Sequence, residues 1–466
     1  MPARIFYILL LASSLVPCVH AASLPPSVLD ALKQAHIPLA DVGIEVRELN
    51  ARKPLLHINA EQSMNPASTM KLLTTYAGLE LLGPSYTWET EAWINGKLEN
   101  GVLQGDLILK GYGDPKFTFE QFWLWLRELR GRGLREIHGN LILDRSAFQL
   151  AAHNPAAFDN DPLRAYNVGP DALLLNFNTI RLHLIPDGEK LNILTEPELA
   201  GIALDNRLRI VAQEDCANWD DAVFPQLNGA TLVLQGTFSP SCGERAKYIS
   251  LLPHAGYMNA VFRSLWQELG GTFSGELRED VVPSSATLFS THSSAPLSEL
   301  IRDINKFSNN VMARQLFLSL SISPSAPAST AHSEQAVRDW LAQKQLGFPD
   351  LVLENGAGLS RAERISPHSM ALLLQSAQNS PMQPEFEASL PIVGIDGTLK
   401  KRLHDSMAAS HAHLKTGSLE GVKTIAGYVQ SRNGKQWIMV FFINHPNASA
   451  GQRAQDALIE WVQQQR

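Results

Sequence analysis

One apolar segment with a lysine near its start constrains this chain most. Residues 70–82 are apolar on nearly every side, and they lie between the turn-forming Asn65-Pro66-Ala67-Ser68 and the helix-stopping Gly83-Pro84. This pattern predicts a helix, and a helix that is apolar all round is buried. Lys71 therefore lies in an apolar environment, where an unpaired ammonium group is costly. The fold must supply Lys71 with partners or with a function.

Ser68 stands three residues before Lys71, and side chains at i and i+3 share a helix face. A serine hydroxyl needs an adjacent base to become a nucleophile, and a desolvated or cation-crowded lysine can be neutral enough to serve. Taken alone, the S-x-x-K pattern also fits a capping serine beside a lysine that reaches to solvent. The apolar surroundings of Lys71 favour the catalytic interpretation.

Two further motifs carry hydroxyl, amide and amine groups. Lys415-Thr416-Gly417 ends a predicted strand, where a lysine and a threonine hydroxyl can bind a carboxylate and a glycine allows close backbone approach. Ser308-Asn309-Asn310 lies between two predicted helices, so its backbone is free to direct Ser308 and Asn310 toward a common point. Alone, the Ser308-Asn309-Asn310 motif is better explained as a helix N-cap before Val311.

The 466 residues exceed what one hydrophobic core usually holds, about 250 to 300 residues. Residues 88–252 are rich in short strands and turns, and we expect them to form an inserted β-rich region of two subdomains, 88–165 and 166–252. Residues 22–87 and 253–466 are expected to form one discontinuous domain, an antiparallel sheet with helices on its faces. Its predicted strands are 42–48, 55–58, 411–415, 424–431 and 436–443.

The order S-x-x-K, S-x-N, K-T-G is the signature of penicillin-binding proteins and serine β-lactamases. Ser308 stands 237 residues after Lys71, and with this spacing the chain resembles the S13 peptidase family. These are D-alanyl-D-alanine carboxypeptidase/endopeptidases of the penicillin-binding protein 4 type, whose extra domains are inserted between the same two motifs. The resemblance implies a mixed α/β fold with a β-lactamase/DD-peptidase-like catalytic domain.

Further stretches of the chain resemble the same family. Where family members often have D-G-S-G-L-S, the segment Glu354–Ser360 has Glu, Asn and Ala at three positions. The other similar stretches are Gly113-Asp114-Pro115, Tyr166-Asn167, Leu174 with Asn176 and Asn178, and Gly394–Leu399.

The resemblance also implies a role for each motif residue. Ser68 attacks the substrate carbonyl, Lys71 is its base, and the backbone N–H groups of Ser68 and Ser418 form the oxyanion hole. The substrate-binding residues are Asn310, Lys415, Thr416, Gly417 and Ser418, and Ser308 relays a proton to the leaving amine. The reaction implied is hydrolysis of D-Ala-D-Ala bonds through a Ser68 acyl-enzyme, without a metal or another cofactor.

The N-terminus predicts export. Arg4 precedes an apolar run, Ile5–Leu11, and Val19-His20-Ala21 resembles a signal-peptidase site, so residues 1–21 are expected to be a cleaved signal peptide and the protein periplasmic. An N-terminal anchor is the alternative, but the apolar run is shorter than the ~20 residues that span a bilayer.

Removal of residues 1–21 takes Cys18 away and leaves two cysteines. In an oxidising compartment Cys216 and Cys242 are expected to form a disulfide, with two free buried thiols as the alternative.

Charge and cysteine content exclude other classes of partner. Lys and Arg number 39 against 46 Asp and Glu, and the chain lacks a basic run, which argues against nucleic acid. Without C-x-x-C or a Cys/His cluster at metal spacing, the sequence predicts no metal site.

The partners that the resemblance implies are peptidoglycan stem peptides and β-lactams as covalent inhibitors. At most, the protein is expected to contact a membrane peripherally through the terminal helix, 452–465. An exported serine β-lactamase and a non-catalytic peptidoglycan-binding protein of the same fold are the alternative functions.

Overall fold

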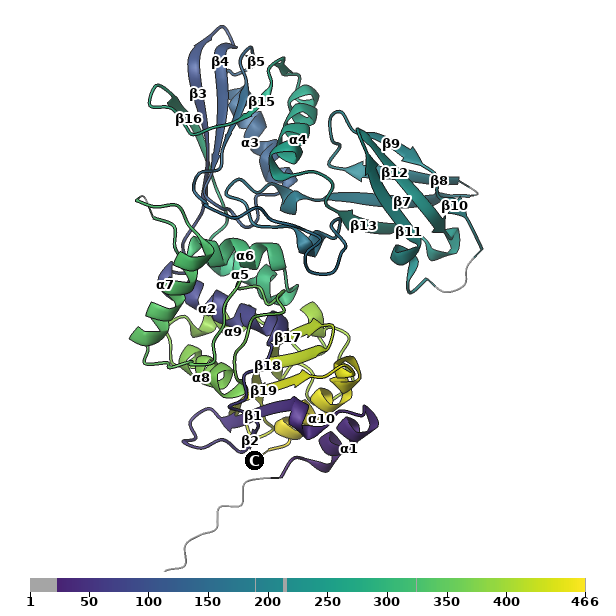
Figure 1. Ribbon diagram of the computed structural model, residues 1–466, viewed down its shortest axis with the longest axis vertical. Helices are drawn as coiled ribbons and strands as arrows, with labels where there is room; N and C mark the ends of the chain where they lie inside the picture. The colour runs from purple at the N-terminus through teal and green to yellow at the C-terminus, as the bar shows by residue number, and fades with distance from the viewer. Residues whose placement is uncertain (1–22, 189, 213–215, 324, 466) are drawn as a thin grey trace, which may run out of the picture.

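The computed structural model describes residues 23–188, 190–212, 216–323 and 325–465. The predicted signal peptide lies outside these residues. Figure 1 shows the two ends of the described chain meeting in the lower part of the molecule, while the middle of the chain forms the upper part.

Both chain ends contribute to one antiparallel sheet, as the sequence predicts. Its five strands have the order β17-β18-β19-β1-β2 within the described residues, so the first two strands of the chain lie beside the last three. The register of β1 against β19 runs from Val42 opposite Ile443 to Glu48 opposite Trp437. The strands are β1 (Val42–Glu48), β2 (Leu56–Ile58), β17 (Ala412–Leu419), β18 (Val422–Gln430) and β19 (Gln436–Asn444).

Helices cover both faces of this sheet, which explains why β19 is apolar at nearly every position. Successive side chains of β19 point to opposite faces of the sheet. Ile438 and Val440 pack with the helices of one face, and Met439 and Phe441 pack with the helices of the other. The first face is covered by α2 (Lys71–Leu81), α5 (Leu297–Lys306), α6 (Asn310–Ser319), α7 (Thr330–Gln343), α8 (Pro367–Gln378) and α9 (Gln383–Ala388). The second is covered by α1 (Pro26–Gln34) and α10 (Gln452–Gln463).

The terminal helix α10 packs on the sheet rather than presenting its apolar face to solvent. Leu458, Ile459 and Val462 are fully buried in the core that α10 shares with α1 and the sheet. Among the described residues, none of the helices is long and apolar enough to cross a membrane.

A second sheet begins directly after α2. Its strands have the order β14-β5-β4-β3-β16, and β6 pairs with β4 and β15. Helices α3 (Phe119–Gly131) and α4 (His254–Glu268) pack in the same core. The strands are β3 (Glu89–Glu99), β4 (Val102–Gly111), β5 (Glu136–Ile137), β6 (Leu141–Asp144), β14 (Thr272–Phe273), β15 (Leu277–Glu279) and β16 (Thr287–Ser293).

The strand pairings suggest a later end for the inserted region than the sequence-based boundary at residue 252. Strand β16 pairs with β3 and β14 pairs with β5, so 272–293 complete the sheet that starts at Glu89. We propose that the insertion extends to about Ser293. Short strands without strong periodicity, such as β14 and β15, are fixed by their pairing partners and not by their own sequence.

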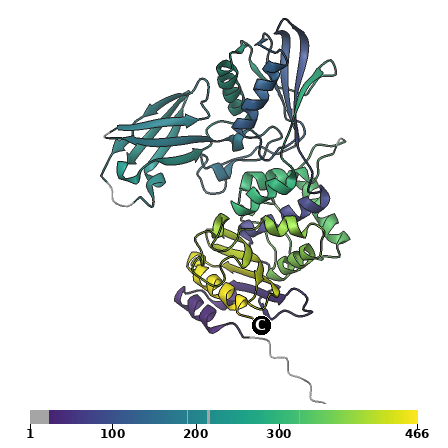
Figure 2. The same ribbon diagram turned by 180° about the vertical axis from the view of Figure 1, so that it is seen from behind.

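Two smaller sheets form the remaining β-rich part, which Figure 2 shows extending sideways from the second sheet. One has the order β13-β7-β8 and the other β10-β12-β11, with β9 beside β12. Their apolar residues join the core of the second sheet. The strands are β7 (Ile180–Asp187), β8 (Lys190–Glu196), β9 (Ala203–Asn206), β10 (Arg209–Ile210), β11 (Val223–Asn228), β12 (Thr231–Phe238) and β13 (Arg245–Ile249).

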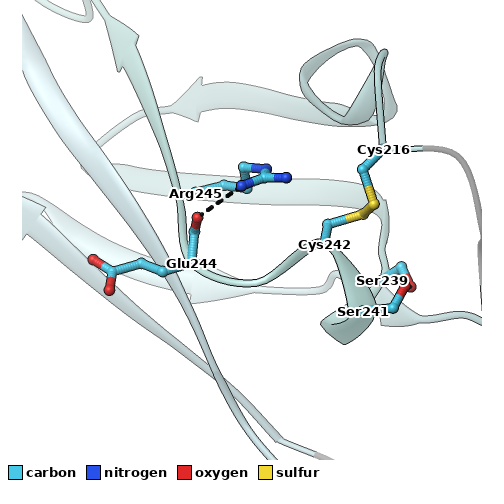
Figure 3. Close-up of a disulfide and its surroundings, with 6 residues drawn as sticks. All are labelled: Cys216, Ser239, Ser241, Cys242, Glu244 and Arg245. Carbon is cyan, nitrogen blue, oxygen red and sulfur yellow. Dashed lines mark hydrogen bonds between the residues drawn. A yellow bond between two sulfur atoms is a disulfide. The ribbon is translucent and has the colours of Figure 1, made fainter.

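The predicted disulfide is present in this part of the molecule. Cys216 and Cys242 are joined across a separation of 26 residues (Figure 3). Cys242 is buried in the core of the inserted region. Closing a loop of this length stabilises the fold by about 3 kcal/mol in the chain-entropy account.

Residues 168–171 of the predicted insertion contact α6. Gln315 on α6 is fully buried; its amide oxygen accepts the Asp171 N–H at 2.9 Å and its amide nitrogen donates to the Asp171 carbonyl at 2.8 Å. Arg314 donates to the Val168 carbonyl at 2.8 Å. The insertion thus fixes the helix whose first residue is Asn310.

Candidate active site

Ser68 and Lys71 meet where a 3-10 turn passes into a helix. Ser68 lies in the turn Ala67–Met70 and Lys71 is the first residue of α2. The Lys71 Nζ lies 3.0 Å from the Ser68 Oγ, within hydrogen-bonding distance. The predicted contact between this hydroxyl and this amine is therefore present, with Ser68 half-buried and Lys71 fully buried.

Lys71 has two more partners, both distant in the sequence. Its Nζ donates to the Asn310 Oδ1 at 2.6 Å and to the Ala357 carbonyl. These partners fix the amine beside the serine hydroxyl without placing a carboxylate against it. The buried amine of the apolar helix is therefore not unpaired, because two other segments supply acceptors for it.

The electrostatic surroundings favour the neutral form of Lys71. Burial is the largest cause that holds its pKa well below the usual value, and the positive charges of Lys415 and Arg314 lower it further, while Glu363 acts in the opposite direction. A neutral amine can accept a proton from Ser68, which is what a general base must do.

The S-x-N motif brings Ser308 to Lys415. Asn309, and not Ser308, caps α6 by accepting the Met312 N–H at 3.1 Å. Ser308 is held with a φ of +57°, and its Oγ accepts from the Lys415 Nζ at 2.8 Å. The helix cap and the functional side chains are thus different residues of one motif.

Lys415 is fully buried on β17, and its Nζ also donates to the Thr416 carbonyl at 2.7 Å. Burial lowers the pKa of Lys415 to about 7. Two lysines with lowered pKa values therefore lie behind Ser68 and Ser308, an arrangement typical of a catalytic site.

Two glycines let backbone segments approach Ser68. A Cβ at Gly417 would lie 2.9 Å from the Ser68 backbone nitrogen and 2.9 Å from the Pro66 carbonyl oxygen. At Gly358, which has a φ of +78°, a Cβ would overlap the Ala67 carbonyl. The side chain of Ser418, the next residue on β17, is exposed. The K-T-G strand and the 354–360 loop thus enclose the backbone of the serine.

Two groups near the site were not singled out from the sequence. Thr398 Oγ1 lies 2.8 Å from Thr416 Oγ1, so the 394–399 loop reaches the K-T-G hydroxyl. Asp396 of the same loop forms an ion pair with Lys306 at 2.6 Å, which fixes the loop beside the S-x-N motif. The similarity of 394–399 to the family was the available signal, although it assigned no role to the loop.

The whole sequence matches one protein family. The model of the D-Ala-D-Ala carboxypeptidase 3 (S13) family aligns with residues 25–465. This chain belongs to the S13 family. It is a serine-type D-Ala-D-Ala carboxypeptidase, as the order and spacing of its motifs predict.

Relatives of this S13 carboxypeptidase share most of its length. The D-alanyl-D-alanine carboxypeptidase DacB of Haemophilus influenzae is 27% identical over 416 residues, covering 87% of this chain and 85% of its own. The D-alanyl-D-alanine carboxypeptidase of Actinomadura sp. strain R39 is 26% identical and covers 84% of this chain and 76% of its own.

The crystal structure of penicillin binding protein 4 from Haemophilus influenzae has the same fold. It superposes with a TM-score of 0.77 at 25% identity, covering 93% of this chain and 99% of its own. A structure of that protein in complex with a novel β-lactam superposes with a TM-score of 0.73. The likeness extends over the inserted region as well as the catalytic sheet.

Glu363 holds the loop Glu354–Ser360 in place beside the serine. The buried Glu363 Oε1 accepts the backbone N–H groups of Glu354, Asn355 and Gly356 at 3.1, 2.9 and 2.9 Å. The loop is thereby held so that the Ala357 carbonyl faces Lys71. Burial raises the pKa of Glu363, and the three N–H donors and Lys71 oppose this shift.

Proposed function

We propose that this enzyme removes the terminal D-Ala of peptidoglycan stem peptides, and cleaves D-Ala cross-links, through an acyl-enzyme on Ser68. The observation that carries the proposal is the environment of Lys71: a buried amine with a lowered pKa, 3.0 Å from the Ser68 hydroxyl. A scaffold protein that only bound peptidoglycan would gain nothing from this costly arrangement.

Acylation begins when the neutral Lys71 amine accepts the Ser68 hydroxyl proton. The Ser68 Oγ forms a bond to the carbonyl carbon of the penultimate D-Ala, and the carbonyl oxygen becomes an oxyanion facing the backbone N–H groups of Ser68 and Ser418. The close approach of Gly417 to the Ser68 backbone supports this assignment, since it brings the start of the Ser418 peptide beside Ser68.

Collapse of this intermediate breaks the peptide bond. Ser308, hydrogen-bonded to Lys415, relays a proton to the departing D-Ala amine, and water then hydrolyses the ester on Ser68. Lys415 and Thr416 bind the terminal carboxylate of the substrate, and Asn310 orients the peptide and Lys71. A β-lactam presents a carbonyl and a carboxylate with similar spacing and acylates the same serine.

The two lysines predict a bell-shaped pH profile of kcat/KM for a D-Ala-D-Ala peptide. Activity needs Lys71 neutral, so the profile falls on the acid side, where Lys71 is protonated. It also needs Lys415 charged, so the profile falls as the pH rises through about 7, the pKa of Lys415. In Lys415→Arg the guanidinium stays charged, and this alkaline fall should be absent even though activity is lower throughout. An unchanged alkaline fall in Lys415→Arg would refute the assignment of Lys415.

Reaction with a fluorescent penicillin and with nitrocefin distinguishes the proposed function from its alternatives. We expect stoichiometric, long-lived labelling together with release of D-Ala from pentapeptides and cleavage of cross-linked dimers. Rapid nitrocefin turnover without D-Ala release would indicate a β-lactamase instead, and neither reaction would indicate a binding protein. Release of D-Ala without cleavage of the cross-linked dimers would restrict the function to carboxypeptidase activity.

We also propose that the enzyme works in the periplasm after cleavage of residues 1–21. The Cys216–Cys242 disulfide supports an oxidising compartment, because such bonds persist outside the cytoplasm. Mass spectrometry of protein purified from the periplasmic fraction tests this: the expected N-terminus is Ala22, and an intact Met1 would contradict it.

A further inference from the structure

A cluster of histidine and glutamate side chains lies away from Ser68, at the other edge of the catalytic sheet. Glu45 on β1 is directly opposite His57 on β2, and His368 follows Pro367 at the start of α8. Glu45, His57 and His368 can bring one potential ligand atom each within 4.8 Å of one another. Glu61, in the turn after β2, completes the cluster.

Glu45 fixes the orientation of both imidazole rings. Its carboxylate is fully buried, and Oε1 forms an ion pair with Arg47 Nε at 2.9 Å. An ionised carboxylate only accepts hydrogen bonds. Its Oε2 lies 3.0 Å from His57 Nδ1 and 2.8 Å from His368 Nδ1. Both rings therefore carry their proton on Nδ1 and turn the lone pair of Nε2 away from Glu45.

The Nε2 atoms of the two rings face one further carboxylate. Glu61 Oε1 lies 3.5 Å from His57 Nε2 and 3.8 Å from His368 Nε2. With the ring protons on the Glu45 side, these contacts set two lone pairs against a negative oxygen. A cation placed between these atoms would be bound by all three of them.

The distance from Glu61 to each ring fits a cation. Ligands bound at about 2.0 to 2.1 Å around a tetrahedral Zn²⁺ lie about 3.3 Å from one another, close to the separations between Glu61 and the two rings. Metal-bound histidines characteristically donate their other ring N–H to a carboxylate, as His57 and His368 do to Glu45.

We propose that His57 Nε2, His368 Nε2 and the Glu61 carboxylate bind a divalent transition metal such as Zn²⁺, with Glu45 orienting both rings from behind. Water completes the coordination, because Glu61 is 68% exposed and both rings are partly exposed. Arg47 balances the charge of Glu45, so the negative charge of Glu61 remains to offset that of the metal.

The metal acts as a clamp between the N-terminal hairpin and α8. The backbone already joins these segments where the His368 N–H donates to the Ala60 carbonyl at 2.8 Å. The segment that follows this contact leads through Met64, paired with Ile365, to the turn that carries Ser68. Binding of the metal to the folded chain therefore stabilises the support of the nucleophile without contacting substrate.

Titration calorimetry of the untagged, metal-free protein with ZnCl₂ tests the proposal, together with the visible spectrum of the Co²⁺ form. We expect one ion per chain, a tetrahedral Co²⁺ spectrum and a higher Tm with Zn²⁺. Glu61→Gln, at an exposed position that does not affect folding, and His57→Gln and His368→Gln should each weaken binding at least tenfold.

His404→Gln is the matched control, because His404 forms an exposed pair with Asp405 at 2.8 Å and should leave Zn²⁺ binding unchanged. Absence of saturable Zn²⁺ binding to the wild-type protein would overturn the proposal. Equal affinity in the wild type and Glu61→Gln would overturn the assigned ligand set.

Discussion

Ser68→Ala should lose covalent labelling by fluorescent penicillin completely and should release D-Ala from a pentapeptide about 10⁴-fold to 10⁶-fold more slowly than the wild type. The hydroxyl is the only group in the proposed reaction that forms a bond to substrate, and removing a serine nucleophile from a hydrolase costs about this much. The missing hydroxyl leaves Lys71 with Asn310 and Ala357 as acceptors, so the fold should be retained.

Ser63→Ala is the matched control for this variant. Ser63 is an exposed serine in the same connecting segment, five residues before Ser68. It should label and hydrolyse like the wild type. Persistent labelling in Ser68→Ala, mapped by peptide mass spectrometry to another residue, would show that the nucleophile lies elsewhere.

Lys71→Met should lower the rate constant of acylation about 10³-fold while leaving the protein at least as stable as the wild type. A general base in this position contributes about 10² to 10⁴ in rate. Methionine has similar length and no charge, so it fills the buried site without the desolvation that lowers the pKa of Lys71. Stopped-flow acylation and thermal unfolding of the same samples measure the two quantities.

A structural role for Lys71 predicts the reverse of this result. If the amine only held Asn310 and Ala357 in place, Lys71→Met would lower the Tm, and acylation by a saturating β-lactam would fall in proportion to the unfolded fraction. Loss of acylation at an unchanged or higher Tm separates the two roles. Asn310→Ala, which removes one acceptor but keeps the base, should fall between the wild type and Lys71→Met.

The long, strongly patterned elements were predictable from the sequence. The strand expected at 42–48 is β1, and the helix expected over 70–82 is α2, Lys71–Leu81. Both elements are buried at nearly every position, so most of their residues are apolar and the apolar pattern indicates a buried element. By contrast, α7 was not predicted, because it buries mainly Ser333, Val337, Trp340 and Leu341, which form a narrow stripe in a polar sequence.

The motif residues of the site were also predictable, because each carries chemistry that its surroundings do not otherwise need. Lys71 in an apolar helix and the ordered triplet of motifs led to Ser68, Ser308 and Lys415, which the fold brings together. Glu363 and Thr398 were not predictable as site residues. Glu363 meets three backbone N–H groups of residues 354–356 and Thr398 meets the Thr416 hydroxyl, and both contacts depend on how separate loops come together in the fold.

The sequence by itself determined the chemistry of this protein: a serine, a lysine three residues later, and two motifs that supply a second lysine and a second hydroxyl. Only the tertiary structure decided how that chemistry is tuned. Asn310 and Ala357 reach Lys71 from 239 and 286 residues away, and His57 and His368, which are far apart in the sequence, meet at Glu45. A pKa or a ligand set depends on distances in space. These distances are fixed only when strands from both ends of the chain pair in one sheet.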